Sequence, residues 1–314
     1  MRSALTLTPS YYEAIKRLTL ELAGINLGAD HTFLIETRLS VLARNQGFED
    51  LSDMVEELFK AGQSNLAVQV VSSLLERDTH FYKDPESFAQ LETVVLPKVY
   101  SGRTGRTIRL LSFGCSSGQE VYCAAMTLDK AKDKFPDADF EIIGVDYPSQ
   151  ALERAKAGRY THFEVQRGLP IRDLITYFEP DKEDWVIKES LRQSVSFEET
   201  HLLSKLDALG KFEVVMFRNA LPHYSSPAQV RVLRGLAALV KPHGCLLLGA
   251  GETLNHINYG FDAINTDKNI FVKREEKVEV YIDPSIKQPN GRKTFERAKR
   301  HVKDIADRPK KNAG

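Results

Sequence analysis

The sequence predicts an α/β protein with two domains, a small all-helical domain followed by a doubly wound sheet that carries a small inserted subdomain. Three observations lead to this prediction. The chain has 314 residues, which is enough for two domains of ordinary size. Residues 1–75 place apolar positions at helical spacing and show no strand pattern. From residue 107, short apolar runs alternate with helical segments, which is typical of a parallel sheet covered on both faces.

Four helices are expected in the N-terminal domain, residues 1–75. The first begins at Thr8-Pro9, where threonine can cap the helix and proline fits its first turn, and it ends at Gly24. The second and third are expected to end near Gly47 and Gly62. The apolar positions of helices two to four are Ile35, Leu39 and Leu42, then Val55, Leu58 and Phe59, then Leu66, Val70 and Leu74. Packed together, these faces predict a small helical bundle.

Residues 76–106 are read as a connector. A helix is expected to start at Asp84-Pro85 and to place Phe88, Leu91 and Val95 on one face as far as Pro97. A polar loop over residues 101–105 then leads into the second domain.

The second domain is assigned to residues 107–283. Strands are expected at 108–113, 141–146, 195–197, 212–217 and 245–248, with helices at about 118–134, 148–156 and 227–240. Residues 259–274 are expected to form a final antiparallel hairpin. Residues 158–192 interrupt this alternation and are read as an insertion. Residues 284–314 are polar and rich in Lys and Arg, and we expect a basic tail that is frayed or disordered.

Composition excludes several functional classes. Lys and Arg together number 43, as do Asp and Glu, so the formal net charge is zero, which argues against a nucleic-acid binder. No apolar run is long enough for membrane insertion, and the N-terminus lacks a signal-peptide core. Three cysteines without CxxC spacing fit reduced thiols in the cytoplasm, and the eight histidines show no paired-ligand spacing, so no metal is predicted.

The most informative turn is Gly-Cys-Ser-Ser-Gly at residues 114–118, between a strand and a helix. Gly114 and Gly118 allow a ligand to approach the backbone closely, and the helix N-terminus favours polar or anionic groups. Asp146 ends the next strand, where a carboxylate can accept both hydroxyls of a ribose. GxGxxG is absent, and Asp146 follows Gly118 by 28 residues, so NAD is not favoured. We expect a nucleoside-containing ligand at the carboxyl ends of the strands, and the alternative is a plain strand–helix turn.

Other interpretations of this region remain open at this point. The same turn matches GxSxG with Ser116 as a hydrolase nucleophile, although only helices precede it here. Cys115 and Cys123 could be nucleophiles, but no histidine has a family-specific spacing to either. Asn219 follows a strand on the same expected edge and could either bind the ligand or close a turn.

Five segments, in order, resemble the CheR-type chemotaxis receptor methyltransferases, which use S-adenosylmethionine to methylate glutamate side chains. THFYKD at 79–84 looks like T-x-F-F-R-[DE], and LSFGCSSGQEVY at 111–122 looks like W-S-A-G-C-S-T-G-E-E-P-Y. GVD at 144–146 with the helix that follows is similar to D-I-[DS] and A-L-x-x-A-x-x-G-x-Y. FRNAL at 217–221 looks like C-R-N-V-L, and LGAGET at 248–253 looks like L-G-H-S-E-S. The resemblance runs from Thr8 to about Lys273.

The resemblance implies a Rossmann-like methyltransferase domain with S-adenosylmethionine as cofactor and S-adenosylhomocysteine as product. The positions that would bind the cofactor are Arg77, Thr79, Gly114, Gly118, Glu120, Asp146, His201, Leu202, Arg218 and Asn219. Glu120 and Asp146 would hold the amino group and the ribose, in an order that stays open. His201-Leu202 stands where the family has an Asn-Leu pair beside adenine.

Three positions depart from the family, and the family residues at two of them, an Arg and a Tyr, sit beside the transferred methyl. Lys83 stands in place of Arg, Arg77 in place of Asn and His223 in place of Tyr, and Lys83 and His223 are the expected catalytic residues. A lysine keeps the positive charge that holds a carboxylate but lacks the two-pronged donor of arginine. The alternative to an enzyme is a non-catalytic module that binds the cofactor or its product in regulation or scaffolding.

The expected partner is a chemoreceptor-like protein, but the surface that would meet it departs from the family. The helix near residues 31–45 has only Arg38 and Arg44 as cations, where the family has a strongly basic helix. Residues 1–75 hold six Lys or Arg and nine Asp or Glu, a net charge of −3. The insertion lacks the glycine-rich loop that grips a receptor's C-terminal pentapeptide, so tethering by that route is not expected.

Overall fold

The computed structural model describes residues 7–28, 31–61, 65–74, 78–147, 150–200, 206–254, 260–265 and 269–274. The chain divides into two compact units. Of the described residues, one unit combines those up to residue 74 with His223–Ala228, and the other combines residues 78–222 with those from residue 229 onward. The expected basic tail lies outside the described residues. Where the chain is described, no helix is both long and apolar enough to cross a membrane.

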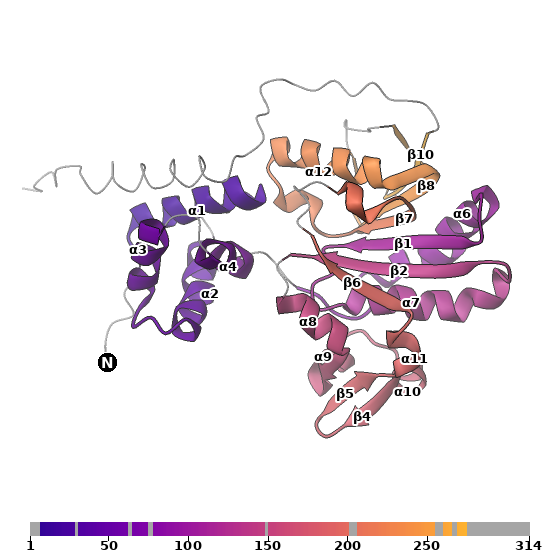
Figure 1. Ribbon diagram of the computed structural model, residues 1–314, viewed down its shortest axis with the longest axis horizontal. Coiled ribbons are helices and arrows are strands. Elements are labelled where there is room, and N and C mark those ends of the chain that lie inside the picture. Colours follow the sequence, from indigo (N-terminus) through magenta and orange to yellow (C-terminus); the bar gives the residue numbers. More distant parts are fainter. Residues whose placement is uncertain are drawn as a thin grey trace, which may run out of the picture. The chain divides into compact units, whose positions relative to one another are not determined.

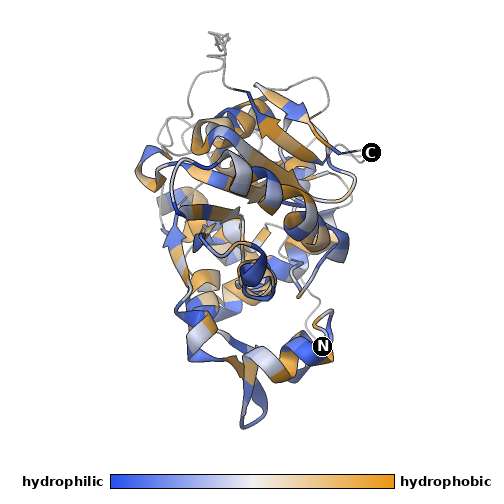
Figure 2. Ribbon diagram, turned by 90° about the vertical axis from the view of Figure 1, so that its right-hand side faces the viewer, coloured by the Kyte–Doolittle hydropathy of each residue, from blue (hydrophilic) through white to orange (hydrophobic). Residues whose placement is uncertain are grey.

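The helical unit has the four predicted helices (Figure 1): α1 (Pro9–Ala23), α2 (Thr32–Asn45), α3 (Leu51–Ala61) and α4 (Asn65–Leu74). Figure 2 colours the ribbon by hydropathy and shows hydrophilic and hydrophobic residues side by side along its helices. Thr8 caps α1 by accepting a hydrogen bond from the Tyr11 N–H at 3.4 Å, and Gly24 ends the helix at φ 75°. Ile15, Leu39 and Leu58 are fully buried, so one apolar core holds the bundle together.

A distant segment of the chain, His223–Ala228, joins this unit. Ile25 and Tyr224 form an antiparallel bridge. The Ser225 N–H donates to the Gly24 carbonyl at 2.8 Å, and the Asn26 N–H donates to the His223 carbonyl at 3.3 Å. These backbone bonds satisfy groups exposed by the end of α1, which is why the segment packs there.

The larger unit is built on a seven-stranded sheet in the order β6-β2-β1-β7-β8-β10-β9 (Figure 1). Its strands are β1 (Thr107–Phe113), β2 (Asp139–Asp146), β6 (Val195–Glu199), β7 (Phe212–Phe217), β8 (Val240–Leu248), β9 (Phe261–Ala263) and β10 (Ile270–Lys273). The first five of these pair in parallel, and β10 is antiparallel to both β8 and β9. The predicted α/β class and the final antiparallel hairpin are confirmed. Strand β8 begins five residues before its predicted start, directly after the preceding helix.

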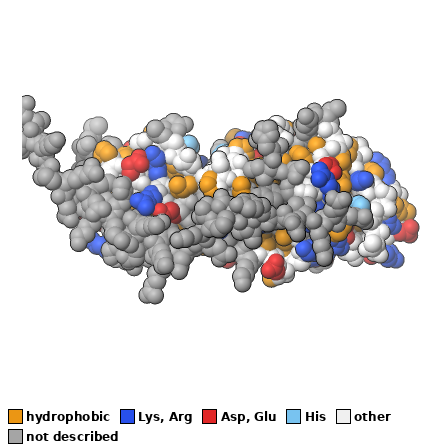
Figure 3. Space-filling model, turned by 90° about the horizontal axis from the view of Figure 1, so that it is seen from above, with side chains coloured by type: hydrophobic (Ala, Val, Ile, Leu, Met, Phe, Trp, Pro, Cys, Tyr) orange, Lys and Arg blue, Asp and Glu red, His pale blue; other side chains and the backbone are white. Residues whose placement is uncertain are grey.

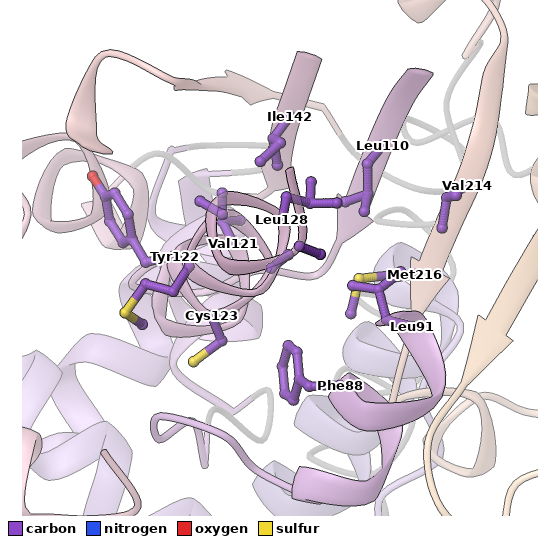
Figure 4. Close-up of a cluster of buried hydrophobic side chains, with 14 of the residues drawn as sticks. Phe88, Leu91, Leu110, Val121, Tyr122, Cys123, Leu128, Ile142, Val214 and Met216 are labelled. Carbon is purple, nitrogen blue, oxygen red and sulfur yellow. The ribbon is translucent and has the colours of Figure 1, made fainter. Parts of the chain in front are cut away.

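Helices on this sheet are α5 (Pro85–Gln90), α6 (Leu96–Gly102), α7 (Gln119–Ala131), α8 (Gln150–Ala157) and α12 (Ser226–Leu239), with short turns η3 (Lys132–Lys134), η4 (Asp207–Leu209) and η5 (Leu221–His223). Figure 4 shows how the core forms, with side chains of α5, η2 (Leu91–Val95), α7 and three strands gathered in one cluster. The labelled members are Phe88, Leu91, Leu110, Val121, Tyr122, Cys123, Leu128, Ile142, Val214 and Met216. This core fixes α7, and with it the turn that precedes α7, against the sheet.

Pro97 does not end the connector helix, contrary to the prediction. A π-helical turn, η2 (Leu91–Val95), precedes α6, and the Leu96 N–H donates to the Leu91 carbonyl, five residues back. This extra residue in the turn places Pro97 in the first turn of α6, where its missing N–H is tolerated.

The insertion forms a small subdomain of its own. Its three-stranded antiparallel sheet has the order β3-β5-β4. The elements are β3 (Arg159–Thr161), α9 (His162–Gln166), α10 (Ile171–Tyr177), β4 (Phe178–Asp181), β5 (Asp184–Ile187) and α11 (Glu189–Arg192). Strands β4 and β5 are joined by two residues, Lys182 and Glu183, so this hairpin has no glycine-rich loop.

Candidate active site

The glycine turn after β1 is tied to the end of β2. The N–H groups of Gly114 and Cys115 both donate to the Val145 carbonyl, at 2.7 and 3.1 Å. Gly118 adopts φ 91° and packs against α8, since a Cβ at this position would lie 2.8 Å from the Cβ of Ala155. Gly114 adopts φ 83° but is exposed, and a Cβ there would have no atom within 4 Å. The turn is therefore closed by packing at Gly118 and open to a ligand at Gly114.

Asp146 is brought beside this turn, as predicted from its place at the end of β2. Its carboxylate accepts hydrogen bonds from the N–H groups of Ser116, at 2.5 Å, and Tyr147, at 2.6 Å. Asp146 is half-buried. The two bonds hold its side chain in one orientation at the turn, and a carboxylate is an acceptor for the hydroxyl groups of a ligand.

Glu120 lies in the first turn of α7, and both its oxygens are already engaged. One accepts from the Ser112 hydroxyl and the other from an Arg218 guanidinium nitrogen, both at 2.8 Å. Glu120 therefore connects the start of α7 with β1 and with the end of β7.

Arg218 is an internal cation, with a side chain only 1% exposed. Besides Glu120, it donates to the Lys83 carbonyl and to the Asp84 carboxylate at 3.3 Å, and it lies over the Phe88 ring. Removing one partner of such a pair leaves a buried charge uncompensated, which is strongly destabilising. The geometry gives Arg218 the role of holding residues 83–84 against the sheet.

Asn219 and Glu252 organise the next part of the edge. Asn219 adopts φ 56° and donates from its side chain to Asp84 at 3.1 Å. The buried Glu252 carboxylate accepts from the N–H groups of Asn219, Leu221 and Gly249, at 2.7, 3.1 and 2.7 Å. The sequence interpretation did not single out Asp84 or Glu252 for these roles. The available signals were an aspartate before proline and a lone acid in a Gly-rich segment after a buried strand.

Residues 78–83 run along the same edge. The Thr79 hydroxyl lies 3.3 Å from the Gln119 side-chain oxygen at the start of α7. The Lys83 ammonium donates to the Asp78 carbonyl at 2.9 Å and lies 3.7 Å from its carboxylate. Arg167, from the inserted subdomain, approaches the other carboxylate oxygen of Asp78 at 2.8 Å.

The charges of this cluster shift two pKa values. The hydrogen bond from Arg167, aided by the charge of Lys83, holds the pKa of Asp78 below its usual value although partial burial opposes this. Burial, together with the charges of Arg167 and Lys83, lowers the pKa of His80, so its imidazole is neutral at pH 7. The cations of this cluster are therefore Lys83 and Arg167.

The other predicted residues are not among those described at this edge. Arg77, His201 and Leu202 lie outside the described residues. His223 belongs to the helical unit rather than to the unit with the glycine turn. Cys115 and Cys123 are buried in the apolar core, and burial raises the pKa of both thiols, which leaves them inert as nucleophiles. Within the ranges that the structure describes, no cluster of three or more His, Cys, Asp or Glu side chains could hold a metal ion.

Comparison with known proteins gives a consistent result. Residues 77–270 match the family described as "CheR methyltransferase, SAM binding domain". The chain is 32% identical to "Chemotaxis protein methyltransferase Cher2" of Pseudomonas putida, over 76% of this chain and 89% of that protein. It is 30% identical to "Chemotaxis protein methyltransferase 1" of Pseudomonas aeruginosa, over 83% of this chain and 97% of that protein. It is 28% identical to "Chemotaxis protein methyltransferase 1" of Vibrio cholerae, over 86% of this chain and 99% of that protein.

Proposed function

The chain belongs to the CheR methyltransferase family, and from this premise we propose that it transfers a methyl group from S-adenosylmethionine to glutamate side chains of a chemoreceptor-like protein. The observation that carries the proposal is the Asp146 carboxylate, fixed by the Ser116 N–H inside the glycine turn. This arrangement offers a nucleoside an acceptor for its hydroxyls and an open backbone at Gly114.

The described residues fit a cationic nucleoside cofactor. Asp146 would accept from the ribose, and Glu120 and Asn219 would line the part of the edge nearest the start of α7 and the end of β7. Two carboxylates, Glu120 and Asp84, flank the buried cation Arg218, so this group of side chains has an excess negative charge that favours a sulfonium ligand. When bound, the cofactor supplies an electrophilic methyl group.

The protein's own part in the reaction is mainly to position the acceptor. A glutamate side chain is ionised at neutral pH and is already a nucleophile, so no general base is needed. Lys83 would hold the acceptor carboxylate in line with the methyl group, and orientation of two reactants can supply much of the rate enhancement. His223 is proposed as a hydrogen-bonding partner of the acceptor, in place of the family's tyrosine.

The partner and the compartment follow from the same premise. The two-residue turn between β4 and β5 supports recognition of the acceptor protein without a pentapeptide tether. Neither nucleic acid nor membrane insertion enters the proposal. All three cysteines are free and buried, which supports a reducing compartment such as the cytoplasm.

Calorimetry and methyl transfer together test this function. We expect the purified chain to bind S-adenosylmethionine and S-adenosylhomocysteine, and to transfer labelled methyl to membranes of the native host. The label should be released by mild base, because carboxyl methyl esters hydrolyse under conditions that leave methylated amines intact. Binding of neither ligand would refute the proposal. Binding without any transfer would instead identify a non-catalytic cofactor-binding module.

A further inference from the structure

We propose that Arg167 and Lys83 together bind the acceptor carboxylate, and that the Asp78 carboxylate occupies this position until the acceptor displaces it. The inference rests on the proposed function and extends it, because it adds a second cation, from the inserted subdomain, to the acceptor site. It also identifies an internal group that competes with the substrate.

Arg167 and Lys83 converge on one carboxylate. Arg167 and Lys83 belong to different parts of the larger unit, yet both approach the carboxylate of Asp78, at 2.8 and 3.7 Å. Hydrogen bonds from arginine and lysine to a carboxylate are among the strong, charge-assisted ones, so the site that holds Asp78 also suits the carboxylate of a glutamate acceptor. Arginine also supplies the two-pronged donor that Lys83 lacks. The pair therefore combines the charge and the fork within one carboxylate-binding site.

The pair of cations lies at the edge of the sheet that carries the glycine turn. Lys83 offers its carbonyl to Arg218, which pairs with Glu120 at the start of α7. The Thr79 hydroxyl contacts Gln119 at the same helix start. The carboxylate-binding site is thus fastened to the edge of the sheet where the glycine turn and Asp146 lie.

The Asp78 carboxylate can be exchanged for that of an acceptor. The side chains of Asp78, Lys83 and Arg167 are 44%, 29% and 46% exposed, so each can be solvated when the ion pair opens. Ion pairs between exposed groups contribute little to stability, and opening this one costs little. Arg218 is the opposite case, since its buried pairs cannot open without leaving a desolvated charge.

Asp78 is not needed to hold Arg167 in place. Gly168 packs so closely on residue 81 that a Cβ there would lie 2.1 Å from the Phe81 carbonyl oxygen. Tyr82 and Lys130 both bond the buried Asp173 of α10, at 2.7 and 2.9 Å. Backbone packing and these bonds fasten the subdomain to residues 81–82, so the Asp78 contact is free to serve as an exchangeable one.

The inference predicts that substitutions of Asp78 and of the two cations change membrane binding in opposite directions. Asp78→Asn should lower the half-saturating amount of native-host membranes by about two- to fivefold, because a competitor worth up to about 1 kcal/mol is removed. Arg167→Ala and Lys83→Ala should each raise it about tenfold or more. The affinity for S-adenosylhomocysteine should stay within about twofold in all three variants. Arg154→Ala, which removes the α8 cation of a 2.8 Å ion pair with Glu164 of the inserted subdomain, is the matched control and should change neither quantity.

Binding is measured by co-sedimentation with the membranes in the presence of S-adenosylhomocysteine, alongside transfer of labelled methyl. A purely structural ion pair predicts weaker binding for Asp78→Asn as well as for Arg167→Ala, and that common sign would overturn the inference. If the variants change membrane binding in the expected opposite directions but the wild-type protein transfers no methyl, the proposed function alone would be contradicted. Normal transfer with the common sign would contradict the further inference alone.

Discussion

At the scale of single residues, the edge of the sheet is held by two buried charges, Arg218 and Glu252. Their residue types and their positions after strands are visible in the sequence. Their roles are not, because the partners of Arg218 are Glu120 and Asp84, 98 and 134 residues away along the chain. Asp146 could be predicted because its position depends only on the end of one strand and the turn after its neighbour. Sequence patterns thus indicate which residues reach an edge, but only the fold decides which of them bond one another.

Asp146 gives the first prediction at this scale. Asp146→Ala should weaken binding of S-adenosylmethionine by about one to two decades, because a hydrogen bond to a charged group contributes about 1.5–3 kcal/mol. Calorimetry measures the affinity, and circular dichroism checks that the fold is kept. Asp139→Ala is the matched control, since Asp139 begins the same strand but pairs with Arg106 at the surface. Equal affinities in the two variants would contradict the placement of the cofactor.

At the scale of elements, helical periodicity and capping residues predicted the four N-terminal helices, and apolar runs predicted the strands of the sheet. Pro97 was misread because the rule that proline stops a helix assumes regular α-helical hydrogen bonding. The π-turn before it changes that pattern. The sequence gives no local signal for this turn, which depends on packing of Leu91 and Val95 in the core.

The glycine turn gives a prediction about how α7 meets α8. Gly118→Ala should destabilise the protein by about 1–3 kcal/mol more than Gly114→Ala. In both variants an alanine must adopt a positive φ, which is strained, but only the alanine at position 118 also collides with Ala155. Urea unfolding measures the difference. Gly114→Ala should in turn weaken cofactor binding, since its methyl group enters the open side of the turn. Equal midpoints would mean that the two helices can move apart without cost.

At the scale of the whole molecule, one segment packs with a unit that is distant from it in the sequence. His223–Ala228 lies within the second domain in the sequence but packs with the helical unit through the backbone bonds to residues 24–26. A linear division of the chain cannot anticipate such an exchange, because it depends on hydrogen bonds between segments about 200 residues apart. The predicted catalytic residue His223 sits in this segment.

The distribution of charge gives the final prediction. Electrostatic steering between a basic and an acidic surface makes association fall steeply with ionic strength. Here the formal net charge is zero and residues 1–75 carry −3. On the face seen in Figure 3, cationic and anionic side chains of the described residues lie among one another rather than in separate fields. Helix α2 instead exposes Phe33 and Val41, at 79% and 47%.

We therefore expect kcat/KM for methyl transfer to native-host membranes to change by less than about threefold between 50 and 300 mM NaCl, because there is little long-range field to screen. Steady-state transfer across this salt series measures it. Arg44→Glu on α2 is the companion variant and should change kcat/KM by less than about twofold at low salt, whereas a steering cation would show a much larger loss there. A fall of more than tenfold across the series would mean that a basic surface does guide the acceptor. In the expected case the acceptor is recognised at short range, by apolar contact and by the cations that hold its carboxylate.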